Sequence, residues 1–136
     1  MSAGSQLGAV ERALAVALAA GRVAIGAGIW LAPRRALPAL GFEHVADDDD
    51  ALTLARIAAT RDLVLGAWQA SALDDRTRLR RATLAVAGCD AGDALAFAVV
   101  ARRGSRPGLA AKGLAGALPA TLAGAWLAAR LASTGN

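Results

Sequence analysis

Four long stretches of mostly apolar residues, separated by short polar segments, make up nearly the whole chain. They cover about residues 13–32, 51–73, 80–101 and 109–131. A helix needs about 20 predominantly apolar residues to cross the hydrocarbon core of a bilayer. The pattern therefore predicts an all-α fold, a bundle of four transmembrane helices, in which residues 1–136 form a single integral membrane domain.

The polar segments are typical of helix ends at a membrane surface. Pro33-Arg34-Arg35 closes the first stretch, and Asp47-Asp48-Asp49-Asp50 precedes the second. Acidic residues at a helix N-terminus cap free N–H groups and interact favourably with the helix dipole. Gly104-Ser105-Arg106-Pro107-Gly108 is predicted to be a turn, and a short polar tail, residues 133–136, ends the chain.

The alternative is a soluble, alanine-rich four-helix protein. A helix on the surface of a soluble protein carries polar residues along a whole stripe. The first stretch has only Arg22 between Arg12 and Arg34, and the fourth has only Lys112. The membrane interpretation is therefore favoured, and it predicts the lipid bilayer as a partner.

The tryptophans and the basic residues bear on position in the membrane. Trp30, Trp68 and Trp126 each fall near the C-terminal end of a stretch, where interfacial aromatic belts occur. The densest group of arginines lies between the second and third stretches. By the positive-inside rule, both termini are predicted to be cytoplasmic and the protein to lie in the inner (plasma) membrane.

Composition excludes several classes of function. Hydrophobic residues make up 56% of the chain and the formal net charge is +4. No basic face with interleaved aromatics appears, so nucleic acid is not expected as a partner. The single Cys89 and single His44 rule out an intramolecular disulfide and a cysteine-based metal cage. No metal, cofactor or catalytic residue is predicted, and an enzyme is less favoured than a binding or structural protein.

Ionisable residues near the centres of the stretches carry the candidate chemistry. They are Arg22, Arg56, Arg61, Asp62, Asp90 and Asp93. Each charge at mid-bilayer costs about 2.5–3.5 kcal/mol on insertion scales, so such residues face the bundle interior and find partners. Three arginines and three aspartates would balance to zero charge.

The spacing of the acids predicts who pairs with whom. Asp90 and Asp93 are three residues apart and share a helix face. Two carboxylates on one face repel each other unless a cation lies between them, and Arg22 or Arg61 could supply it. We expect Arg22 to pair with Asp90 or Asp62. Gly88 and Gly92, which have small-xxx-small spacing, are expected to mark a packing seam within the bundle.

Two segments resemble a known group of proteins. One is Gly21-Arg22-Val23-Ala24-Ile25-Gly26 before Trp30-Leu31-Ala32-Pro33, and the other is Arg56 followed by Arg61-Asp62-Leu63 and Leu65-Gly66. With the Asp90/Asp93 segment, they resemble the small four-helix membrane proteins, common in actinobacteria, grouped as DoxX-like or of unknown function. The resemblance implies a four-helix integral membrane fold and no established reaction.

Several functions remain open at this point. The leading hypothesis is binding, or helping to move, a small amphipathic ligand such as a lipid or quinone. Arg22, Arg61 and Asp90 would contact its head, with Arg56, Asp62 and Asp93 behind them. The alternative is an accessory subunit of a larger membrane complex, or a homo-oligomer, in which the charges are a packing network. Proton or ion movement, and an enzyme acting on a lipid through Asp90 and Asp93, come after these.

Overall fold

The computed structural model describes residues 7–104 and 106–133, and helices make up almost all of this part of the chain. The helices are α1 (Ala9–Leu31), α2 (Pro33–Ala39), α3 (Asp49–Ser71), α4 (Arg76–Arg103) and α5 (Pro107–Ser133), with a 3₁₀ turn at Glu43–Val45. Ser105 of the predicted turn, residues 134–136 of the predicted tail and residues 1–6 of the predicted domain lie outside the described residues.

The all-α class is confirmed, but the predicted four-helix bundle is wrong, because the described residues form five α-helices. The additional helix is α2, which the sequence analysis placed in a polar connection. Helix α1 ends at Leu31, and Ala32 leaves the helical conformation with φ −140°. Pro33 then occupies the first turn of α2, a position where its missing N–H costs nothing and its fixed φ favours helix.

Three of these helices are long and apolar enough to cross a membrane, namely α1, α4 and α5. Helix α3 is not among them, because Arg56, Arg61 and Asp62 all fall in its middle. The membrane character of the chain is thus supported by three helices, and the prediction of four spans is corrected to three.

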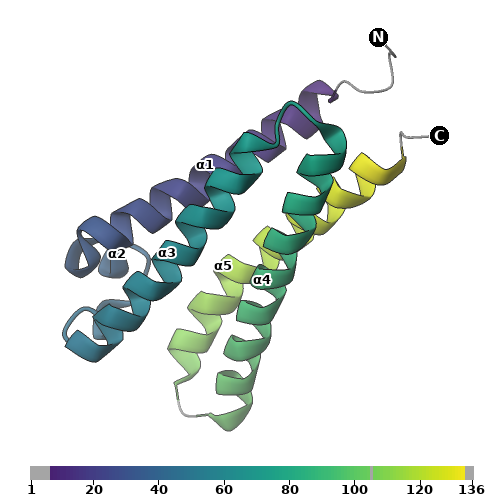
Figure 1. Cartoon of the computed structure of the whole chain (residues 1–136). Helices are drawn as coiled ribbons and strands as arrows, with labels where there is room; N and C mark the ends of the chain where they lie inside the picture. The colour runs from purple at the N-terminus through teal and green to yellow at the C-terminus, as the bar shows by residue number, and fades with distance from the viewer. Residues whose placement is uncertain (1–6, 105, 134–136) are drawn as a thin grey trace.

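The helices form two antiparallel pairs, α1 with α3 and α4 with α5 (Figure 1). The pairs approach each other where α1 begins and α5 ends, and they diverge toward the other end, where α2 lies (Figure 1). We call these the closed end and the open end. The start of α1 and the end of α5 therefore lie at the same end of the molecule.

Within each pair, glycines allow close approach. A Cβ at Gly26 of α1 would lie 2.9 Å from the carbonyl oxygen of Ala59, and one at Gly66 of α3 would lie 3.0 Å from that of Ala19. In the other pair, Gly113 lies against the ring of Phe97. Small residues thus bring the backbones together, as in membrane helix packing.

The predicted seam at Gly88 and Gly92 is wrong. Both residues are exposed on α4, and a Cβ at either would meet no described atom within 4 Å. The seams were misplaced because small-xxx-small spacing shows which helix face is small and not what packs against it.

An ion pair and an apolar cluster join the two pairs at the closed end. Arg76, at the start of α4, donates to both carboxylate oxygens of the buried Glu11 in α1, at 3.0 and 3.2 Å. It also donates to the carbonyl oxygens of Arg130 and Leu131 at the end of α5, at 2.9 and 3.2 Å. A cation at a helix C-terminus satisfies carbonyls that lack helical partners. Buried alanines and leucines lie in this region, namely Ala15, Ala72, Leu79, Ala82, Leu127 and Leu131.

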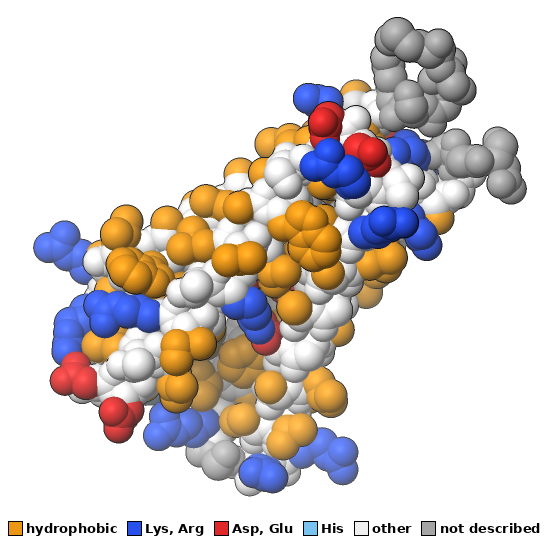
Figure 2. All heavy atoms as spheres, viewed as in Figure 1, with side chains coloured by type: hydrophobic (Ala, Val, Ile, Leu, Met, Phe, Trp, Pro, Cys, Tyr) orange, Lys and Arg blue, Asp and Glu red, His pale blue; other side chains and the backbone are white. Residues whose placement is uncertain are grey.

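The outer surface is apolar along its flanks. Figure 2 shows hydrophobic side chains over the length of the molecule and most charged side chains at its two ends. Trp30, Trp68 and Trp126 are all exposed. Helix α3 contributes Leu54 and Ile57 to this surface. Such continuous apolar exposure indicates contact with lipid or with another protein.

Candidate functional site

Five of the six predicted site residues meet halfway along the helices. Arg22 comes from the middle of α1, Arg61 and Asp62 from α3, and Asp90 and Asp93 from α4. Helices α1 and α3 are antiparallel and equal in length, so their midpoints coincide and Arg22 faces Asp62. We call these five residues the ionic network.

The inner half of the network is centred on Arg22. Its Nη1 donates to Oδ1 of Asp62 at 2.9 Å, and its Nη2 donates to both carboxylate oxygens of Asp90 at 2.6 Å. The side chains of Arg22 and Asp90 are only 11% and 8% exposed. The prediction that Arg22 pairs with Asp90 or Asp62 is confirmed for both partners, and Arg22 ties three helices together.

The outer half is a two-bond pair between α3 and α4. Arg61 donates from Nη1 to Oδ1 of Asp93 at 2.9 Å and from Nη2 to Oδ2 at 2.6 Å. Nη2 also lies 3.5 Å from Oδ1 of Asp62, which links the two halves. Unlike the inner half, this pair reaches the surface, since Arg61 and Asp93 are 38% and 37% exposed.

Each carboxylate on α4 therefore has its own arginine. The repulsion expected between Asp90 and Asp93 is relieved because Arg22 binds the first and Arg61 binds the second. Charge-assisted hydrogen bonds of this two-bond type are the strong class, and they fix geometry as well as charge. The network consequently fixes the rotation of α4 against the α1–α3 pair.

Arg56 does not belong to this network. It is exposed, and its Nε donates to the carbonyl oxygen of Trp30 at 3.4 Å, near the open end of α1. Two guanidinium groups therefore face three carboxylates, which leaves a formal charge of −1 instead of the expected balance. The prediction missed this because Arg56 lies more than one helical turn from Arg61.

The network retains unused donors. The Nε atoms of Arg22 and Arg61 are buried, and neither has a hydrogen-bond acceptor within residues 7–104 and 106–133. A buried donor without a partner costs about 1–3 kcal/mol. The two arginines thus have hydrogen-bonding capacity beyond what the three aspartates use.

Sequence reasoning missed the Glu11–Arg76 pair at the closed end. The two residues are 65 positions apart, and each reads by itself as an ordinary charge at a helix end. Among the described residues, no group of three His, Cys, Asp or Glu side chains is placed to hold a metal ion.

Comparison with known proteins adds no family. No family model matches the chain, and no significant match is found among curated proteins or solved structures. The resemblance to the DoxX-like group therefore stays a prediction, and the function is argued from the geometry alone.

Proposed function

We propose that this is a small multi-pass membrane protein that binds, or helps to move, a small amphipathic ligand of the lipid or quinone type. The observation that carries the proposal is the Arg61–Asp93 pair, which reaches the surface halfway along the helices while the flanks around that depth are apolar. In the space-filling view, basic and acidic side chains meet in a hollow between the two helix pairs, midway along the orange flank (Figure 2).

The physical argument is one of solvation. In a bilayer, a charged pair at this depth would face hydrocarbon, where unsatisfied polar groups cost several kcal/mol. A ligand with a polar head and an apolar body would cover the pair with the head and the flank with the body. Arg61 and Asp93 together offer both donors and acceptors. The inner half of the network, being closed, holds the outer half in position.

The proposed setting is the inner (plasma) membrane with both termini on the cytoplasmic side. The start of α1 and the end of α5 lie at the same end. Arg78, Arg80 and Arg81 lie near that end, at the start of α4, and positive residues favour the cytoplasmic side.

A second candidate is an accessory subunit of a larger membrane complex, or a homo-oligomer. Gly88 and Gly92 support it, because both are exposed on α4 with open space beside them. A partner helix could approach closely there and cover the Arg61–Asp93 pair with a polar side chain of its own.

The test is native mass spectrometry of the protein extracted in a mild detergent, with the double variant Arg61→Gln/Asp93→Asn beside it. The double variant removes the pair without leaving an unpaired charge, and it keeps similar volume. We expect the wild type to carry a small molecule and the double variant to lose at least nine-tenths of it. The loss is measured as the ratio of bound to free protein.

Arg34→Gln is the control, because Arg34 forms an exposed ion pair with Asp49 away from the network. It should keep the bound molecule. A co-purifying polypeptide in place of a small molecule would establish the subunit alternative. Equal retention of the small molecule by the wild type and the double variant, or a bare wild type, would overturn ligand binding at this pair.

A further inference from the structure

A second site stands out at the open end, remote from the ionic network. A cavity of about 560 Å³ lies between the chain that leads into α3 and the start of α5. Its lining comes from residues 41–51 on one side and residues 106–112 on the other. Because α5 is a candidate span that begins at Pro107, the cavity lies at the depth where lipid headgroups meet the protein.

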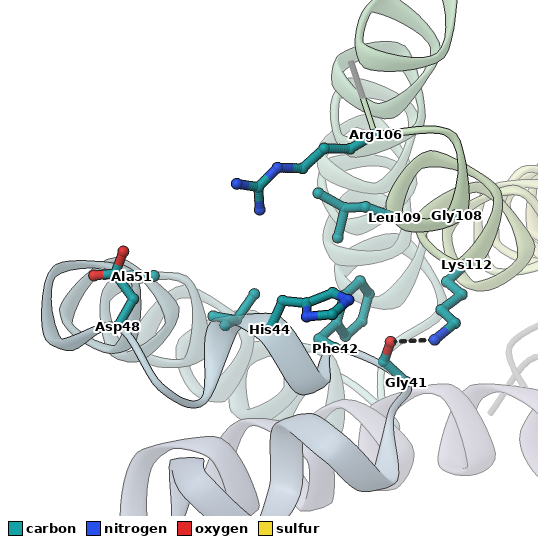
Figure 3. A pocket seen from close by; sticks show the side chains of 10 residues that line it. Gly41, Phe42, His44, Asp48, Ala51, Arg106, Gly108, Leu109 and Lys112 are labelled. Carbon is teal, nitrogen blue, oxygen red and sulfur yellow. Dashed lines mark hydrogen bonds between the residues drawn. The ribbon is translucent and has the colours of Figure 1, made fainter. Parts of the chain in front are cut away.

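The floor of the cavity is held in place by specific contacts. Lys112 of α5 donates to the carbonyl oxygen of Gly41 at 2.7 Å and pairs with Glu43 at 3.1 Å (Figure 3). Gly41 has φ +88°, a backbone conformation that favours glycine. Phe42 stacks on Phe97 of α4 with ring centroids 6.4 Å apart.

The Lys112–Glu43 contact keeps its charges near neutral pH. The pKa of the Glu43 carboxyl is lowered by a hydrogen bond from its own backbone N–H and by a second from Lys112. Lys112 is therefore occupied as a structural contact, and the cavity's binding capacity rests on other groups.

Two opposite charges in the lining remain available. Arg106 extends from the α5 side across the cavity, toward the α3 side where Asp48 lies (Figure 3). Within the described part of the chain, the Arg106 guanidinium has no hydrogen-bond acceptor, and it forms no ion pair with Asp48. Asp48 caps α3 by accepting from the N–H groups of Asp50 and Ala51 through Oδ1 alone, at 2.9 and 3.0 Å. Its other oxygen is free of contacts to described residues.

We propose that this cavity binds the headgroup of a zwitterionic phospholipid, a phosphodiester joined to a primary ammonium. The planar guanidinium of Arg106 matches two phosphate oxygens, and Asp48 would accept from the ammonium. The neighbouring acids Asp47, Asp49 and Asp50 favour a ligand that carries a positive group over a purely anionic one. Apolar side chains in the lining, Phe42, Val45 and Leu109, are suited to the glycerol and upper acyl carbons. This site is independent of the ligand proposed for the Arg61–Asp93 pair.

The experiment measures lipid retention from nanodiscs that hold equal amounts of phosphatidylethanolamine and phosphatidylglycerol with identical acyl chains. Native mass spectrometry counts the lipids that remain on the protein. The wild type is expected to retain the ethanolamine lipid about three- to fivefold in excess, the ratio that one exposed ion pair supplies. Asp48→Asn keeps the Oδ1 cap, since Asn caps as well as Asp, and it should bring the ratio to about one.

Arg106→Gln is expected to reduce retention of both lipids, because both carry the phosphate. Arg103→Gln, which removes an exposed arginine at the same end of α4, is the matched control and should keep the wild-type ratio. The Arg61→Gln/Asp93→Asn variant should also keep it, which separates failure of this site from failure of the mid-depth site. Free phosphoethanolamine, added as a competitor, should not displace the lipid.

A wild-type preference for phosphatidylglycerol, equal retention of the two lipids, or an unchanged ratio in Asp48→Asn would each overturn the proposal. Displacement by free phosphoethanolamine would show that the ligand is a soluble head and not a lipid. Circular dichroism of each variant checks that the helices are intact, so a lost preference cannot be assigned to unfolding.

Discussion

Arg22→Ala is expected to lower the free energy of unfolding by about 3–5 kcal/mol, the cost of removing one partner from a buried ion pair. Arg22 alone neutralises Asp90 and shares Asp62 with Arg61. Without it, Asp90 would be 8% exposed with no cation beside it. The measurement is equilibrium unfolding in a mild detergent, followed by circular dichroism, together with the yield of monodisperse protein.

Two further variants make the result specific to the network. Arg22→Ala/Asp90→Asn removes the stranded charge and should recover a large part of the lost stability. Arg34→Ala should cost less than about 1 kcal/mol, because Arg34 and Asp49 are 60% and 88% exposed. If Arg22→Ala unfolds at the wild-type midpoint, the network does not hold the helices together.

The mid-depth site could be predicted from sequence because it depends on few quantities. Antiparallel helices of similar length bring their midpoints together, and charges near those midpoints must find each other where lipid is the alternative. This reasoning placed Arg22 beside Asp62 and Asp90 without coordinates. It could not exclude Arg56, since a displacement of little more than one turn is within the uncertainty of a predicted helix boundary.

Other features depended on information that a single sequence does not display. Helix α2 follows directly from α1 through Ala32, and proline at position 33 reads equally as a helix end or a helix start. The open-end cavity requires Gly41 to meet Lys112 across 71 residues. Hydropathy and spacing describe one helix at a time, so contacts between the two helix pairs lay beyond them.

The glycines show the same limit and lead to a prediction with a large expected effect. In α3, Gly66→Leu should lower the free energy of unfolding by roughly 3 kcal/mol, at the upper end of the usual cost of overpacking. A Cβ there would lie 2.8 Å from Cγ2 of Val23 and 3.0 Å from the backbone oxygen of Ala19. A backbone oxygen cannot rotate away, so α1 and α3 must separate, and the Arg22–Asp62 contact between them would lengthen.

Gly88→Leu is the matched control, because it makes the same exchange in the middle of another helix. Its Cβ would meet no described atom within 4 Å, and replacing glycine with a strong helix former gains about 0.5–1 kcal/mol. The two variants should thus change the unfolding midpoint in opposite directions in the same detergent. If Gly88→Leu is the damaging one, then α4 packs against a partner through that face, and the subunit alternative gains direct support. If Gly66→Leu is neutral, then α1 and α3 do not pack closely at this glycine, and the ionic network must hold them alone.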